Sequence, residues 1–227
     1  MINVAVWIFY VLVALFTFFG PIKAKGGEIE TLNKSIELQK NAEVQKTIKA
    51  ASFDPGRGDA DGMTPLMTAS MHGNLPAMKL LLQKKANLEQ KNKFGDTALA
   101  LAVSNDQESA AKLLIASGAK VDIAVLSENK DNLLITAAKS NEKTTRLILA
   151  KNKSIINQTN ALGNTALIES IMAGYTNIAK SLIQSGADTA IKNNQGKTAL
   201  DISKELKNKA LTTLLSKRAA TIDAAVN

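Results

Sequence analysis

The segment Gly62-Met63-Thr64-Pro65-Leu66-Met67-Thr68-Ala69 recurs in related form at 95–102, 132–137, 163–167 and 196–200. The spacing between successive copies is constant, except that the step from the second copy to the third is longer by two positions. A run rich in Leu follows each copy in phase, as at 80–82 and 113–115. A repeat period in the range of about 20–50 residues predicts a solenoid of small stacked units.

Each unit predicts two short helices. Thr64 can open the first helix, because its hydroxyl can accept from an amide that has no partner at the helix start. Pro65 suits the first turn, where its missing N–H has no consequence. Gly73 ends this helix, and a second amphipathic helix carries the Leu run. Since neither helix can bury its apolar face alone, we expect burial between units to supply most of the stability.

The pattern resembles the ankyrin repeat, whose period is 33 and whose first helix opens with Thr-Pro-Leu-His-x-Ala. The resemblance runs from Asp59 to Leu215. It implies an all-α fold, an ankyrin-repeat solenoid of stacked helix-turn-helix units with β-hairpin-like loops. The family histidine is absent from every copy, so its hydrogen bonds between hairpins are expected to be missing. The residues at its position are Met67, Ala100, Ile135, Ile168 and Asp201.

The repeat register predicts the domain organisation. Residues 59–216 form five units, at about 59–91, 92–126, 127–159, 160–192 and 193–216. Residues 25–58 are predicted to be N-terminal capping helices from a degenerate repeat, because Thr31 lies one repeat period before Thr64. Two extra residues near 126–129 predict a longer hairpin in the third unit, and residues 217–227 are expected to be a C-terminal tail.

Residues 1–24 form an address segment. Ile2 to Phe19 is almost continuously apolar and ends at Gly20-Pro21, with an acceptable cleavage site after Ala24. Residues 2–19 are therefore either part of a cleaved export signal or a retained membrane anchor. The absence of cysteine makes the secretory pathway of a higher cell, where disulfides are common, a poor fit. We expect a bacterial periplasmic or secreted protein, with membrane anchoring as the alternative.

Composition argues against several classes of function. There is no cysteine and one histidine, so a thiolate metal site, a cysteine nucleophile and any metal site with two histidines are excluded. Asp59-Ala60-Asp61-Gly62 opens like a calcium loop but lacks the closing Glu, because Ser70 stands there. The formal charge of +8 is spread out without an Arg cluster, which argues against nucleic acid. We expect no enzyme activity, cofactor or metal.

The resemblance places the hairpin tips and the ends of the first helices along a binding groove. Several apolar side chains fall at these positions, and flexible Met beside an aromatic anchor is typical of protein interfaces. The alternative is that they pack between neighbouring hairpins. The predicted partner-binding residues are Met63, Met71, His72, Lys93, Phe94, Asp96, Leu162, Asn164 and Met172.

These observations favour a non-enzymatic protein-interaction module of the cell envelope. It would bind and regulate, inhibit or protect against a partner protein such as a cell-wall-active hydrolase. The alternative is a membrane-tethered structural adaptor that keeps residues 2–19 as its anchor. Alone, the chain is expected to be monomeric.

Overall fold

The structure is a computed structural model that describes residues 27–122 and 129–226, and only the backbone of residues 221–226. The predicted address segment at 1–24 lies outside the described residues. So does the predicted longer hairpin near 126–129, apart from Asn129.

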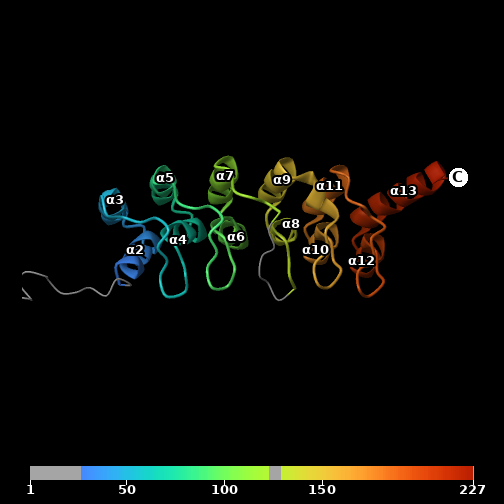
Figure 1. Ribbon diagram of the computed structural model, residues 1–227. Coiled ribbons are helices and arrows are strands. Elements are labelled where there is room, and N and C mark those ends of the chain that lie inside the picture. Colours follow the sequence, from blue (N-terminus) through green and yellow to red (C-terminus); the bar gives the residue numbers. More distant parts are fainter. Residues whose placement is uncertain (1–26, 123–128, 227) are drawn as a thin grey trace, which may run out of the picture.

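The helices form two layers, and successive helix pairs lie side by side along the stack (Figure 1). The inner layer consists of α2 (Gly27–Glu37), α4 (Pro65–Met71), α6 (Ala98–Ser104), α8 (Leu133–Ala138), α10 (Ala166–Met172) and α12 (Ala199–Glu205). The outer layer consists of α3 (Asn41–Lys49), α5 (Leu75–Gln83), α7 (Glu108–Ala116), α9 (Glu142–Lys151) with η1 (Lys153–Asn157), α11 (Thr176–Gln184) and α13 (Lys209–Val226). The described part contains no strand beyond one isolated bridge between Thr159 and Thr165. The predicted all-α fold is confirmed.

The inner helices begin where the sequence predicts. The Thr64, Thr97 and Thr165 hydroxyls accept from the amide three residues later at 3.2, 3.2 and 3.3 Å, and the Asn132 side chain does so at 2.8 Å. Such a cap typically stabilises a helix by about 1 kcal/mol. The inner helices from α4 to α12 have only six or seven residues, so the caps supply a large share of the local preference for helix.

One hydrophobic core runs the length of the stack, from Leu32 to Leu215. Leu66, Leu99 and Leu167 are each at most 1% exposed and recur at the same place in their units. Burying such a side chain contributes about 1.5–3 kcal/mol. Because each layer covers the apolar face of the next, a unit on its own would lose most of this burial.

The two ends of the stack depart from the regular repeat in detail. Thr31, which is in register with the helix-opening threonines, lies inside α2, where its hydroxyl donates to the carbonyl of Gly27 at 2.6 Å. At the other end, α13 continues through most of the region expected to be a tail and reaches Val226.

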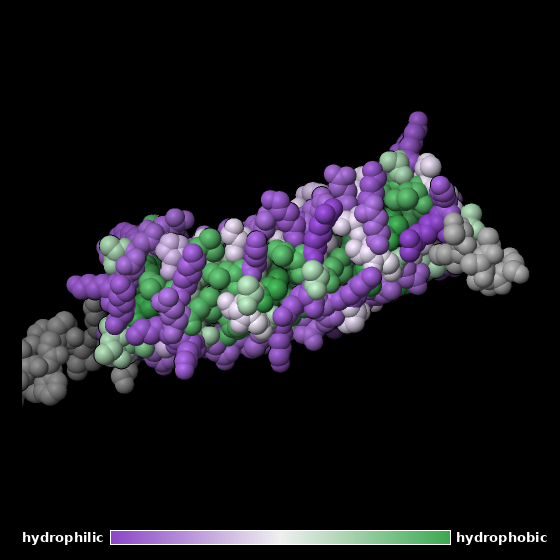
Figure 2. All heavy atoms as spheres, turned by 90° about the horizontal axis from the view of Figure 1, so that it is seen from above, coloured by the Kyte–Doolittle hydropathy of each residue, from purple (hydrophilic) through white to green (hydrophobic). Residues whose placement is uncertain are grey.

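The outer layer presents an apolar stripe along the stack that is crossed by hydrophilic side chains (Figure 2). The opposite side of the inner layer carries the described hairpin-like loops, which project in the same direction (Figure 1).

Each described loop at 59–64, 92–97, 160–165 and 193–198 is closed by its first side chain. Asn92 is representative: its Oδ1 accepts from the amides of Phe94 and Asp96, both at 2.9 Å. The backbone amide of Asn92 in turn donates to the Asp96 carbonyl at 3.1 Å. A glycine at the fourth position supplies the positive φ that completes the turn, as at Gly95 with φ 78°.

Neighbouring hairpins are hydrogen-bonded even though the family histidine is missing. The amide of Lys93 donates to the Asp61 carbonyl at 2.9 Å, and the amide of Asn194 donates to the Leu162 carbonyl at 3.0 Å. Backbone pairing and the Asn side chains thus connect the loops of adjacent repeats.

Gly163→Ala should destabilise the stack more than Gly196→Ala. Both residues have nearly the same φ, 73° and 74°, so the left-handed conformation costs about 1 kcal/mol in each case. A Cβ on Gly163 would lie 2.8 Å from the amide nitrogen of Asn194, whereas one on Gly196 meets nothing within 4 Å. We expect an additional cost of about 1–3 kcal/mol for Gly163→Ala alone, measured by urea denaturation. Equal costs would show that the contact between hairpins does not restrict Gly163.

Candidate functional site

We define the inner face as the surface made by the hairpin tips and the C-terminal ends of the inner helices. In the third and fifth units, the residue just before the helix-capping residue lies beside the residue eight positions later, at the end of the inner helix. Lys139 Nζ lies 2.9 Å from Asp131 Oδ2, and Lys197 Nζ lies 2.8 Å from Glu205 Oε2. The same two positions therefore carry an ion pair in both units, but the acidic and the basic residue exchange places.

The hairpin tips present apolar side chains on a restrained backbone. Phe94 is 60% exposed, and Leu162 at the equivalent position two repeats later is 46% exposed. Their amides donate to Asn92 Oδ1 at 2.9 Å and to Asn160 Oδ1 at 3.0 Å. Lys93 beside Phe94 is also exposed. An exposed aromatic ring on a fixed backbone suits a protein contact, because little backbone entropy is lost on binding.

The inner helix ends add further apolar surface. Met172 is 51% exposed, and Met71 at the equivalent position is half-buried. Leu38, which lies one repeat period before Met71, is 53% exposed and belongs to the same row. The sequence analysis missed Leu38, although the repeat register could have found it. Tyr175, 41% exposed in the loop after α10, was also missed.

Besides Met71, three predicted residues are only partly accessible. Met63 packs against the core, and its Sδ accepts from Asn92 Nδ2 at 3.3 Å, so it follows the alternative of packing between hairpins. Asp96 and His72 are half-buried. His72 is the residue that caps the C-terminal end of α4. The pKa of Glu37 is lowered mainly by the hydrogen bond from Lys34 Nζ at 3.0 Å, and His72 makes a smaller contribution.

The prediction for Asn164 is corrected by its burial. Its side chain is 2% exposed, because it lies between two hairpins and under the end of α10. Its Nδ2 donates to Glu169 Oε1 at 2.9 Å, and its Oδ1 accepts from Asn193 Nδ2 at 3.0 Å. Asn164 therefore holds the hairpins together and does not offer its side chain to a partner.

Asn164 belongs to a buried polar network that connects the third, fourth and fifth units. Glu169 on α10 is 7% exposed and accepts from the Nδ2 atoms of both Asn160, at 3.0 Å, and Asn164. Asn160 Nδ2 also donates to Asp131 Oδ1 at 2.9 Å, and Asp131 in turn pairs with Lys139. The network contacts both exposed residues: the backbone amide of Leu162 donates to Asn160 Oδ1 at 3.0 Å, and Asn164 Nδ2 lies 3.7 Å from Met172 Sδ.

Glu169→Ala should destabilise the stack by about 2–4 kcal/mol, because it leaves two buried amide donors without this acceptor. Thr68→Ala is the matched control at the equivalent position of the first unit, where the side chain is 7% exposed and the expected cost is below about 1 kcal/mol. Urea denaturation measures both. A cost for Glu169→Ala no greater than that of the control would contradict this role of the network.

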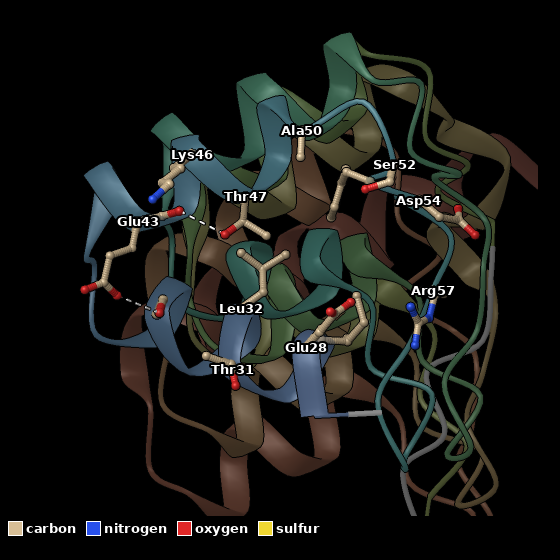
Figure 3. A pocket seen from close by; sticks show the side chains of 13 residues that line it. Glu28, Thr31, Leu32, Glu43, Lys46, Thr47, Ala50, Ser52, Asp54 and Arg57 are labelled. Carbon is tan, nitrogen blue, oxygen red and sulfur yellow. Dashed lines mark hydrogen bonds between the residues drawn. The ribbon is translucent and has the colours of Figure 1, made fainter. Parts of the chain in front are cut away.

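A hollow of about 520 Å³ opens at the free end of the stack, between α2 and α3 (Figure 3). Its wall includes Ser35, whose hydroxyl donates to Glu43 Oε2 at 3.1 Å, and Thr47, whose hydroxyl donates to the Glu43 carbonyl at 3.1 Å. Leu32 and the first layer of the core form its floor. The hollow marks the end layer, which has no preceding repeat among the described residues.

The described residues contain no group of three or more His, Cys, Asp or Glu side chains placed to hold a metal ion. No described helix combines the length and the apolar character needed to cross a bilayer.

The family model for ankyrin repeats (3 copies) matches residues 32–125 and 133–225. The chain belongs to the ankyrin-repeat family. The matched ranges begin inside the segment expected to be an N-terminal cap and extend into α13. Ankyrin repeats are protein–protein interaction modules and are generally not catalytic.

Two solved structures of bacterial proteins have the same fold. One is the complex of the predatory endopeptidase Bd0816 from Bdellovibrio bacteriovorus with the immunity protein Bd3460. The match to its immunity protein is 45% identical, has a TM-score of 0.77, and covers 86% of this chain and 98% of that chain. The other is an ankyrin repeat domain from Acinetobacter baumannii, with a TM-score of 0.73 at 22% identity, covering 82% of this chain and 95% of that chain. The second shows the fold alone.

Among curated relatives, Rabankyrin-5 of Homo sapiens is 30% identical over 192 residues, which is 74% of this chain. The Caenorhabditis elegans ankyrin repeat and KH domain-containing protein mask-1 is 35% identical over 133 residues, or 58% of this chain. The chain spans only 16% and 5% of the length of these two relatives.

Proposed function

We propose that this chain is a non-enzymatic binding protein that neutralises a cell-wall-active endopeptidase in the cell envelope. The observation that carries the proposal is the 45% identity along 98% of an immunity protein in complex with an endopeptidase. This similarity extends along the stack and is not confined to one repeat motif.

The inner face offers two apolar anchors for such a partner. The first is Phe94, and the second is formed by Leu162 and Met172. The anchors are two repeat periods apart, which corresponds to about 20 Å when neighbouring helices pack about 10 Å apart. The ion pair between Lys139 and Asp131 lies in the repeat between the two anchors. Anchors at this separation can hold a folded partner in one orientation.

Inhibition of this kind needs no catalytic group on the inhibitor. A rigid stack bound beside the catalytic cleft of an endopeptidase blocks a polymeric substrate by occupying its path. The continuous core and the hydrogen bonds between hairpins provide that rigidity. The restrained backbone at Phe94 also limits the entropy lost on binding.

Phe94→Asp should weaken binding to the target endopeptidase by about 30-fold to 1,000-fold, which is the usual range for losing an aromatic hot spot. The matched control is Ser109→Asp, which introduces the same charge at an exposed position on the outer helix of the same repeat. We expect this control to bind within about threefold of the parent chain. Binding is measured by calorimetry against purified cell-wall endopeptidases of the source cell, and inhibition by release of peptidoglycan fragments.

Two outcomes would count against the proposal. If no endopeptidase of the source cell binds the parent chain, the assigned partner class is wrong. If one binds and Phe94→Asp retains full affinity, the partner class stands and the assignment of Phe94 is wrong.

The cellular location is part of the proposal. An exported, processed chain would begin at Lys25, on the cell-wall side of the inner membrane. We expect mass spectrometry of the native protein to find this N-terminus. A native chain that still carries residues 2–19 would instead favour the membrane-tethered adaptor.

A further inference from the structure

The outer helices carry a row of basic residues, one per repeat. The residues have equivalent places on successive helices, so each lies about one repeat period after the previous one. The row is exposed at its first four positions and half-buried at the last, whereas Ala77 and Met78 in α5 and Ala110 and Ala111 in α7 are buried. The row consists of Lys46, Lys79, Lys112, Arg146 and Lys180.

The helices of the two layers have opposite charge. The outer helices α3, α5, α7, α9 and α11 contain eight basic and three acidic residues. The inner helices α2, α4, α6, α8, α10 and α12 contain two basic and six acidic residues. The positive charge of the helices is therefore concentrated on the side of the stack opposite the hairpins (Figure 1).

Acidic neighbours reduce this charge only in the middle of the row. Glu142 Oε1 lies 2.6 Å from Arg146, and Glu108 Oε2 lies 3.4 Å from Lys143. No ion pair is found for Lys79, Lys112 or Lys180 among the described residues.

Half-buried leucines accompany the basic row. Leu80, Leu113 and Leu147 each follow a member of the row directly and remain partly accessible. Between α7 and α9, a hollow of about 360 Å³ has Leu147 and Ala150 in its wall, together with three basic residues and one acidic residue: Lys112, Lys143, Arg146 and Glu108. The same combination is visible along the outer layer as an apolar stripe crossed by hydrophilic side chains (Figure 2).

We propose that the outer helices form a docking surface for an anionic phospholipid bilayer. Neighbouring helices about 10 Å apart place the row along about 40 Å of the stack, and this spacing lets several lysines contact one membrane surface together. Lysine attracts acidic lipid headgroups, and the accessible leucines can contact the boundary of the acyl chains. Duplex nucleic acid fits the same row less well, because the five outer helices contain one arginine, already paired with Glu142, and no aromatic residue.

A reporter on the outer layer tests the proposal in the full chain. Because the protein has no cysteine, Ser109→Cys on α7 can be labelled specifically with an environment-sensitive dye. Ser104→Cys, exposed at the C-terminal end of α6, is the matched control. With vesicles of phosphatidylglycerol and phosphatidylcholine, we expect a blue shift of the dye at position 109 and none at 104. Vesicles of phosphatidylcholine alone should shift neither, since the attraction depends on lipid charge.

Charge variants made in the labelled Ser109→Cys chain identify the residues responsible. Lys79→Ala, Lys112→Ala and Lys180→Ala together should lower the vesicle affinity about 100-fold at low salt, or about fivefold per lysine. The control removes the same charge from exposed lysines elsewhere, by Lys93→Ala, Lys192→Ala and Lys204→Ala, and should change the affinity by less than about threefold.

Several results would overturn the proposal. These are equal shifts at positions 104 and 109, no shift on anionic vesicles, or equal losses in the two triple variants. A stronger response of the same label to duplex DNA at the same phosphate concentration would reassign the surface to nucleic acid. Insertion of the N-terminal apolar segment alone does not require anionic lipid. A dye shift at position 109 that is equal on anionic and neutral vesicles would therefore indicate insertion and not docking.

Discussion

The structure depends above all on burial between consecutive helix pairs. The inner helices α4 to α12 have only six or seven residues and would be marginal in isolation. Their Leu side chains lose water only when the next layer covers them, so the smallest stable object is several repeats long. Small residues such as Ala69, Ala102 and Ala137, all fully buried, let the inner helices come close enough for this contact. The continuous core therefore fixes the positions of the helices and hairpins that form the surface.

The buried polar groups add specificity to this apolar stack. A carboxylate at position 169 would be costly in the core without partners, yet two Asn side chains donate to it. Such an arrangement is satisfied in only one relative position of the neighbouring hairpins. The network thus connects local sequence in three repeats to the geometry of the surface that presents Leu162 and Met172.

Much of the fold can be predicted from short-range signals. Thr64 and its counterparts identify each inner helix because the cap involves an amide only three residues away. The exposure of Phe94 follows equally well, since a turn tip has little around it to cover a side chain. Asn164 could not be placed in this way. Its burial depends on Glu169, five residues later, and on Asn193, 29 residues later, and these contacts exist only once the hairpins are stacked.

The basic row escaped the sequence analysis for a related reason. Its members are a full repeat apart, so they read as isolated lysines spread through a chain of charge +8. Only the stacking of outer helices turns that spacing into a row.

The same stacking separates the two proposed surfaces, because the core lies between the outer helices and the hairpin tips. A bilayer on the outer layer would leave the hairpins pointing away from the membrane, with Phe94 accessible from the aqueous side. Membrane docking and capture of an endopeptidase are therefore compatible in one molecule. Membrane docking would restrict capture to partners that approach from the side facing the cell wall.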